Sequence, residues 1–523
     1  MPRRTAVNTL IFSVATGLSR IAGLVREVVA AAYFGTGGPA SAFTLAFQIP
    51  NLIRALVADA ALSSAFVPVF SDLLEHKRRK EAYQLASALA GLILVALGAI
   101  TLLFILLAPT IIPLFTGDTF SPELNRLCAG LSQVLFPIVV LLGLNGLAVG
   151  ILNAHDHFSV PAIAPLVWNL VIIAGLVVVT PFFHGPNRLY GYAIGVVAAT
   201  VVQLAMMLPT LRRIGYPVAR IRLPSRDDPR VRQVLKLMLP VSVGLGLINI
   251  DLLLNSTLGS LVSDQAPRAI DAAFRIYMLP QGMFSVAVAT VLFPHLSRLA
   301  ARHDTDGVRA TTGVGLRQIA LLLIPAGAVM LVLATPITRL VYERGEFDAE
   351  STRLTAEALF WFSFSLPFSG FNLLLTRTFF SLQRPWLPTS LALGSLVVNV
   401  AVSVALYKPL GIAGLVLGTA VSNAVLTLAE ARWLRVQLNG LEVTRSLISV
   451  VGMLEGAVVL GLVTYVVWSG LDGALGRSLP AQIVSVGGGI AVGALAYAGV
   501  VLALGLPEAH QVRDLFRQRL RRS

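Results

Sequence analysis

The sequence is poor in charged residues and in cysteine. Charged side chains make up 13% of the 523 residues, whereas soluble domains carry about 25%. The single cysteine, Cys128, lies in an apolar run, so an intrachain disulfide and a cysteine-based metal site are excluded. Alternating polar and apolar residues, the pattern of a β-barrel, are absent as well.

Catalytic motifs are also missing. We find no P-loop, no G-x-S-x-G motif and no histidines at metal-ligand spacing. The sequence therefore predicts a protein that is not an enzyme, has no cofactor or metal site and carries no ATPase. If the chain carries out work, its energy would come from ion gradients, the membrane potential or the supply and consumption of substrate. The net charge of +14 would suit a nucleic-acid partner, but its distribution argues against one.

Apolar runs are abundant, and the mean hydropathy is +0.80. Runs of about 20 residues, enough to cross a bilayer as a helix, recur from end to end. We predict an all-α polytopic membrane protein with about 14 spans, at 7–34, 40–70, 84–114, 126–153, 158–183, 188–211, 233–264, 269–297, 312–338, 353–378, 386–407, 411–431, 446–470 and 479–507. Arg20 and Arg26 interrupt the first run, which favours a span over a cleaved signal peptide.

Basic residues gather in alternate connections between these spans. Of the 40 Lys and Arg residues, 27 lie in 3–4, 77–80, 212–236, 298–309, 377–384, 432–445 and 513–522. Only eight lie in the opposite set of connections. Basic loops stay on the cytoplasmic side, so both termini are predicted to be cytoplasmic. The basic runs also predict contact with anionic lipids.

The longest polar stretch divides the first twelve spans into two sets of six. Ala46-Phe-Gln-Ile49 in the second span resembles Ala273-Phe-Arg-Ile276 in the eighth, and paired halves are a common transporter plan. We predict two six-helix lobes and two additional C-terminal helices. The boundaries are 1–211 for the first lobe, 212–232 for a basic linker, 233–435 for the second lobe, 436–507 for the additional helices and 508–523 for a basic tail.

Five arginines lie within apolar spans. Arg317 is close to a helix end and is predicted to extend its charge to the interface. The other four are Arg20, Arg26, Arg54 and Arg275. An arginine at bilayer depth costs about 3 to about 15 kcal/mol, so these side chains should face protein or a watery cavity. They are candidate ligands of an anion.

Internal pairing is the alternative role for these arginines. Asp271 precedes Arg275 by four residues, a favourable spacing for a salt bridge on one helix, and Glu27 adjoins Arg26. Asp59 lies five residues beyond Arg54. From the residues alone, anion binding and pairing are about equally supported. Gly17 and Gly23 are predicted hinges that would let the first helix bend and aim Arg20 and Arg26 into one cavity.

Several motifs resemble the MurJ (MviN) family of lipid II flippases in the MOP exporter superfamily. They run in order over most of residues 7–435, and their combination is specific. The matching stretches are Ser19-Arg20-x-x-Gly23-x-x-Arg26-Glu27, Phe47-Gln-Ile-Pro-Asn-Leu-Ile-Arg54, Gly150-Ile-Leu-Asn153, Leu279-Pro-x-Gly282, Thr290-Val-Leu-Phe-Pro294 and Tyr342-Glu-Arg-Gly-Glu-Phe347.

The resemblance implies a transporter that moves lipid II, an undecaprenyl-pyrophosphate-linked peptidoglycan precursor, across a bacterial cytoplasmic membrane by alternating access. It further implies a cationic cavity in which Arg20, Arg26, Arg54 and Arg275 bind pyrophosphate. Guanidinium groups bind phosphate bidentately and stay charged when buried. Glu27, Asp59 and Asp271 would then hold the arginines between substrates. The last two helices would border a groove for the lipid tail.

A monovalent cation site is a further expectation. Asp251 and Asn255 in the seventh span, with Asn399 and Thr419 in the eleventh and twelfth, are candidates for it. Some family members hold sodium in this region with carboxylates, but the best-matching positions here, Asn255 and Ser403, are not acids, and Asp251 is offset. Hydrogen bonding between helices is the alternative role for these residues. Glu455, in the middle of the thirteenth span, receives no role from the sequence.

Other functions remain open at this point. One is export of another polyprenyl-linked saccharide or of drugs, although four arginines suit an apolar or acidic drug cavity poorly. Another is an enzyme acting on polyprenyl phosphates, but the acidic metal-binding motifs it requires are absent. We expect a monomer, with cell-wall synthesis proteins as candidate partners.

Overall fold

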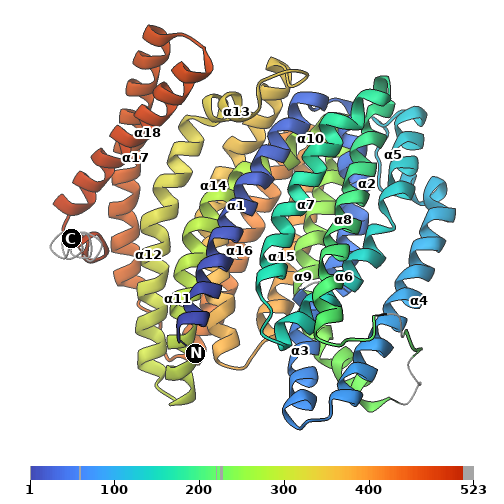
Figure 1. The fold of residues 1–523 in the computed structure, drawn as a ribbon. Coiled ribbons are helices and arrows are strands. Elements are labelled where there is room, and N and C mark those ends of the chain that lie inside the picture. The colour runs from blue at the N-terminus through green and yellow to red at the C-terminus, as the bar shows by residue number, and fades with distance from the viewer. Residues whose placement is uncertain (1, 58–59, 219–220, 224–227, 511–523) are drawn as a thin grey trace. The chain divides into compact units, whose positions relative to one another are not determined.

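The computed structural model describes residues 2–57, 60–218, 221–223 and 228–510, and every regular element in these ranges is a helix (Figure 1). The predicted all-α fold is therefore confirmed. Contacts divide the chain into two compact units. Unit 1 comprises Met1–Arg268 with Arg344–Phe347, and unit 2 comprises Ala269–Glu343 with Asp348–Ser523. The lobe boundaries at 211 and 233 stay a prediction, since the structure groups residues up to 268 with unit 1.

Unit 1 is built from nine α-helices in the described ranges, with short 3-10 turns between some of them. They are α1 (Pro2–Phe34), α2 (Gly38–Val57), α3 (Ala60–Glu75), α4 (Arg79–Ile111), α5 (Pro122–Leu135), α6 (Ile138–Ala154), α7 (Ser159–Val178), α8 (Arg188–Arg213) and α9 (Pro229–Val262). Ser121 caps α5 by accepting a hydrogen bond from the Leu124 amide, and Asp228 caps α9 through the amides of Arg230 and Val231.

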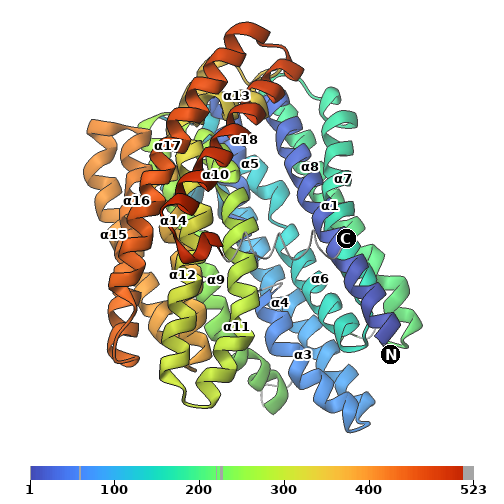
Figure 2. The ribbon, with the colours of Figure 1, turned by 90° about the vertical axis from the view of Figure 1, so that its left-hand side faces the viewer.

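Unit 2 contains the remaining α-helices, the first of which crosses the boundary between the units. They are α10 (Ala266–Pro280), α11 (Val286–Ala301), α12 (Thr305–Val332), α13 (Ala334–Tyr342), α14 (Ala349–Ser381), α15 (Trp386–Leu410), α16 (Ile412–Gln437), α17 (Val443–Leu475) and α18 (Leu479–Ala503). Within this unit α17 and α18 lie side by side, as Figures 1 and 2 show.

The number of membrane spans is lower than predicted when judged by length and composition. In the described part of the chain, 11 helices are long and apolar enough to cross a membrane, or 12 if the bent pair Pro229–Gly244 and Asn249–Val262 is one span. Neither α1 nor the α2–α3 segment is among them. The count of 14 therefore stays a prediction.

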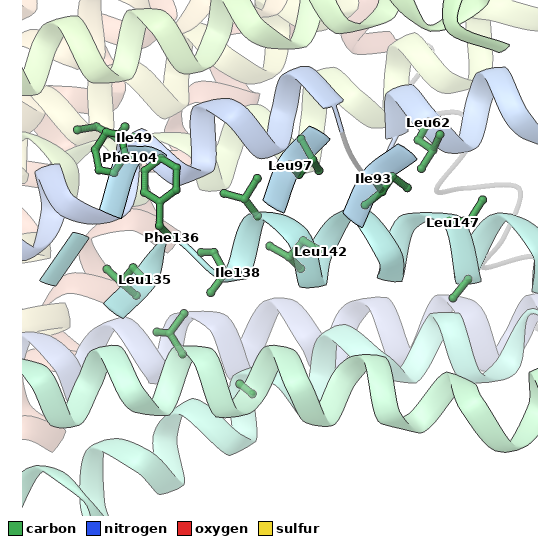
Figure 3. Close-up of a cluster of buried hydrophobic side chains, with 14 of the residues drawn as sticks. Ile49, Leu62, Ile93, Leu97, Phe104, Leu135, Phe136, Ile138, Leu142 and Leu147 are labelled. Carbon is green, nitrogen blue, oxygen red and sulfur yellow. The ribbon is translucent and has the colours of Figure 1, made fainter. Parts of the chain in front are cut away.

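The core of unit 1 contains large apolar side chains from several helices, and Figure 3 shows those contributed between α2 and α6. The rings of Phe104 and Phe136 stack with their centroids 3.7 Å apart. Gly143 lies so close to α4 that a Cβ atom there would be 2.9 Å from a methyl group of Leu97. Lipid tails are as apolar as these side chains, so close van der Waals packing rather than removal from water holds such helices together.

Two glycines bring α7 and α8 into close contact. A Cβ atom added at Gly175 would lie 2.8 Å from the Cα of Gly195. Real Cβ atoms do not approach this closely, so any larger residue would push the helices apart. This contact positions α7, which carries two residues of the site described below.

Arg317 is buried rather than extended to the interface. It lies on α12, its side chain is 2% exposed, and its Nε donates a hydrogen bond of 2.5 Å to Glu508. Its Nη1 lies 2.8 Å from an oxygen of Glu442, which precedes α17. The sequence-based assignment to a snorkelling arginine was wrong, because two carboxylates reach the guanidinium from the flanks of the C-terminal helix pair. This cluster ties α12 to the segments bordering α17 and α18.

A π-helical turn, η4 (Gln281–Ser285), separates α10 from α11. It contains Gly282, around which no atom lies within 4 Å of an ideal Cβ position. π-helical turns are rare and are frequently found at functional sites. This one lies a few residues after Arg275.

Candidate functional site

Arg26 on α1 is surrounded by groups that fix its guanidinium plane. Its Nη1 donates a hydrogen bond of 3.1 Å to Asn169 on α7, and its Nη2 lies 2.6 Å from Glu27. The guanidinium carbon lies 5.0 Å from the ring centroid of Trp168, a cation–π contact. Trp168 is itself held by a hydrogen bond from its indole nitrogen to Thr200 on α8. The arginine is thus preorganised by three helices of unit 1.

Glu27 lies between two arginines. One carboxylate oxygen contacts Arg26, and the other lies 3.5 Å from Nη1 of Arg268 at the start of α10. Glu27 is 4% exposed and Arg268 is 8% exposed, so all three charges are largely removed from water. Two guanidiniums therefore converge on one buried carboxylate, and desolvating these charges has a cost in free energy that their mutual contacts offset.

One donor of this cluster has no acceptor. The Nε of Arg26 is buried and makes no hydrogen bond with any described residue. An unmet buried donor costs about 1 to 3 kcal/mol, more when it is charged. A phosphate oxygen is the kind of acceptor that would relieve this cost, since guanidinium groups bind phosphate through two donors.

Arg54 belongs to a second polar group in unit 1. Its Nε donates a hydrogen bond of 2.9 Å to Asn51, one helical turn earlier on α2. Asn51 in turn donates a hydrogen bond of 2.9 Å to Asn249 on α9. This chain of amides helps to orient Arg54. Asp59, its predicted partner, lies outside the described residues.

Arg275 on α10 pairs with Asp271 in the way its spacing predicts. Its Nε lies 2.9 Å from one oxygen of Asp271, and its Nη2 lies 3.4 Å from the other. The Arg275 side chain remains one-third exposed, whereas that of Asp271 is 12% exposed. The carboxylate therefore holds the guanidinium by one edge and leaves part of its surface accessible.

Arg20 differs from the other candidate arginines because it is exposed and makes no hydrogen bond or ion pair with any described residue. The carbonyl of its neighbour Ser19 accepts a hydrogen bond of 3.3 Å from Asn169. The helix α1 continues through Gly17 and Gly23 without a break. The role of these glycines as hinges stays a prediction.

The four residues of the expected cation site fall in both units. In unit 1, Asn255 donates a hydrogen bond of 3.3 Å to Asp251. In unit 2, Asn399 accepts one of 3.1 Å from Ser403, and Thr419 is buried on the adjacent helix α16. Among the described residues no group of three or more His, Cys, Asp or Glu could hold a metal ion. The cation site stays a prediction.

Three functional candidates escaped the sequence analysis. Asn169 and Trp168 read as ordinary residues of an apolar span, and Arg268 appeared to be one of the outer-side loop charges. Their distances along the chain from Arg26, more than 140 residues, hide the contact. The one feature of the sequence that could have indicated Asn169 and Trp168 is an asparagine next to a tryptophan within an apolar run. Glu455 lies exposed on α17 and joins none of these groups.

The comparisons with known proteins agree with one another. The family model described as "Lipid II flippase MurJ" matches residues 30–477. A relative from Rhizobium meliloti (strain 1021), described as a probable lipid II flippase MurJ, is 31% identical over 79% of this chain and 78% of its own length.

Two solved structures resemble the fold. The structure described as lipid II flippase MurJ in an inward closed conformation has a TM-score of 0.78 and 22% identity, covering 97% of this chain and 100% of its own. An inward-facing multidrug resistance MATE family transporter of the MOP superfamily has a TM-score of 0.68 and 16% identity, covering 83% of this chain and 95% of its own.

Proposed function

The chain belongs to the lipid II flippase MurJ family, and on this premise we propose that it translocates lipid II from the inner to the outer leaflet of the bacterial inner membrane. As a member of this family it is a multi-pass membrane transporter rather than an enzyme. Lipid II is its proposed substrate, and the translocation proceeds by alternating access.

The observation that supports this proposal most directly is the cluster around Glu27. It combines two arginines that converge on one buried carboxylate, low exposure and an unmet donor at Arg26 Nε. A pyrophosphate offers several oxygens and a dense negative charge, which a fixed guanidinium fork matches in geometry as well as in charge. Asn169 and Trp168 hold the fork in place before the substrate arrives.

The remaining arginines are further phosphate-binding groups. Arg20 and Arg54 serve in unit 1 and Arg275 serves in unit 2, where Asp271 holds Arg275 between substrates. The membrane potential or a monovalent cation bound near Asp251 and Asn255, or near Asn399 and Thr419, supplies the driving force. The tail of the substrate stays in lipid, in a groove bordered by α17 and α18.

Alanine substitutions test this proposal. We expect Arg20→Ala, Arg26→Ala, Arg54→Ala and Arg275→Ala each to abolish or badly impair complementation of a conditional flippase depletion. Leaflet-resolved labelling should show lipid II retained in the inner leaflet, because each change removes a phosphate-binding charge. The control is Arg432→Ala, an exposed residue on α16. Normal growth with all four variants would refute the pyrophosphate site.

The orientation in the membrane is a second testable part of the proposal. Both termini are cytoplasmic and the connection at 343–350 is external, because basic loops stay on the cytoplasmic side. The measurement is labelling of single introduced cysteines in a Cys128→Ser background with a reagent that does not cross the membrane. Labelling of a cysteine in the 212–232 linker in intact cells would show that the orientation is the opposite of the one proposed.

A further inference from the structure

A seam of polar side chains runs between α14 and α16 inside unit 2. On α16 it comprises Asn423, Thr427 and Glu430, spaced at four and three residues so that they share one face. On α14 it comprises Asn372 and Thr376, also one turn apart. None of these residues belongs to the proposed substrate site or to the expected cation site. The seam therefore needs an explanation of its own.

The part of the seam formed by Asn372, Asn423 and Thr427 is held together by hydrogen bonds. Thr427 donates a hydrogen bond of 2.6 Å to the side-chain oxygen of Asn372. The amide nitrogen of Asn372 in turn lies 3.2 Å from both the side-chain and the backbone oxygens of Asn423. These contacts are ordinary interhelical hydrogen bonds, which stabilise packing within a membrane. The other end of the seam, formed by Thr376 and Glu430, contains a polar atom without a hydrogen-bond partner in the described chain.

Glu430 is fully buried and only half satisfied. Its exposed fraction is 0%. One carboxyl oxygen accepts a hydrogen bond of 2.9 Å from Thr376. The other, Oε2, is buried without any hydrogen-bond partner in the described chain. A single neutral hydroxyl is far too little to stabilise a carboxylate charge at such a place.

Among the described residues, no cation compensates Glu430. On α14, Glu350, Arg353 and Glu357 lie roughly five to seven turns from Thr376, and Arg377 instead places its guanidinium 5.7 Å from the ring centroid of Phe293. On α15 the titratable residues Tyr407 and Lys408 lie at the opposite end. On α16 itself, Arg432 and Arg435 are exposed and point away from the buried face. An ionised Glu430 would thus be an isolated charge in an apolar interior.

We propose that Glu430 is a proton-binding site: the carboxyl group is protonated in this structure, and its deprotonation loosens the seam between α14 and α16. The chemical step is the reversible binding of one proton by one carboxylate oxygen, with no other bond made or broken. Thr376, which is partly exposed, is the neighbour through which the proton would exchange with water. The ligand is a proton, so conformation and proton concentration become linked.

The linkage has a defined sign. A buried carboxyl that is neutral in the folded protein keeps its proton where the unfolded chain has already lost it. Stability then falls as pH rises above the range in which a free glutamate titrates, about pH 4 to 5. A carboxyl that stayed ionised in the fold would show the opposite dependence or none.

The test uses the purified full-length protein in detergent or nanodiscs and compares wild type, Glu430→Gln and Glu357→Gln. Glutamine preserves the shape of a protonated carboxyl, and Glu357 is a partly exposed carboxyl on α14 that serves as control. Infrared difference spectra between about pH 6 and about pH 9 should show a protonated-carboxyl band that disappears with rising pH in wild type and in the control. The band should be absent in Glu430→Gln. The unfolding temperature should fall by several degrees as the pH rises over the same range in wild type and in the control, but not in Glu430→Gln.

A second variant guards against a glutamine variant that does not fold. Thr376→Val removes the hydroxyl donor, so it should shift the frequency of the protonated-carboxyl band without abolishing it. A wild-type protein whose spectrum shows no protonated buried carboxyl at about pH 6 would overturn the proposal. So would a dependence on sodium concentration at fixed pH in place of the pH dependence, because the carboxylate would then bind a cation.

A second experiment measures transport, and it rests on the proposed function. In proteoliposomes, an imposed pH gradient should change lipid II translocation several-fold in wild type and leave Glu430→Gln unaffected. Transport insensitive to the gradient in wild type would refute the link between proton binding and transport. Because the spectra and the unfolding curves require no lipid II, proton binding is judged separately from the flippase activity.

Discussion

Replacing Arg26 with lysine is expected to reduce lipid II translocation by tenfold or more while the protein still folds and inserts. Lysine keeps the positive charge, but its compact ammonium group lacks the rigid planar fork of donors with which the guanidinium contacts Asn169 and Glu27 at separate nitrogens and keeps Nε for a phosphate. It also loses the cation–π contact of the guanidinium with Trp168. Leaflet-resolved lipid II labelling after depletion of the resident flippase measures the effect. Arg432→Lys is the control.

The same reasoning separates phosphate capture from internal pairing at Arg275. Arg275→Lys should likewise fold but transport poorly, whereas Asp271→Asn should keep or strengthen lipid II binding because it removes a carboxylate that competes for the guanidinium. If the arginines were only structural, lysine would restore function. Asp271→Asn would then destabilise the fold by several kcal/mol, since it breaks a partly buried ion pair. Normal transport by both lysine variants together with loss of stability in Asp271→Asn would rule out capture.

Arg317→Ala should cause a large loss of stability. The guanidinium lies among Glu508, Glu442 and Ser446, and its removal leaves two carboxylates without a cation. Breaking a buried ion pair typically costs about 3 to 5 kcal/mol. We expect a fall in the unfolding temperature in detergent on the order of 10 °C.

Two controls define the origin of this loss. Arg309→Ala breaks an ion pair with the exposed Asp306 and should cost no more than about 1 kcal/mol. The triple variant Arg317→Met, Glu442→Gln, Glu508→Gln should regain much of the stability, because no uncompensated charge remains. Equal unfolding temperatures for Arg317→Ala and Arg309→Ala would show that the cluster is not important for stability.

The sequence was sufficient for the fold class and for the local pairs, because both depend on short-range patterns. Apolar runs of about 20 residues predict helices, and a spacing of four residues predicts the contact between Asp271 and Arg275. The contacts of Arg26 could not be predicted in this way. Asn169 lies 143 residues away, and only the packing of α7 on α1 brings the two together.

Arg317 shows why burial is harder to predict than helix formation. Its distance from a helix end suggested access to the interface, but access depends on what covers that end. Glu442 and Glu508 come from segments far along the chain and flank the C-terminal helix pair. Their carboxylates offset the free-energy cost of burying the guanidinium. Neither helical periodicity nor loop charge predicts such an ion pair.

The number of residues in the π-helical turn η4 determines the direction of Arg275 relative to α11. Such a turn accommodates an additional residue within an otherwise continuous helix, and each residue rotates an α-helix by about 100°. Deleting one residue between Gln281 and Ser285 would therefore turn Arg275 to a different side relative to α11, although every remaining side chain is unchanged. Point substitutions do not test this arrangement. Insertions and deletions in this segment are the changes by which a relative would redirect its arginine.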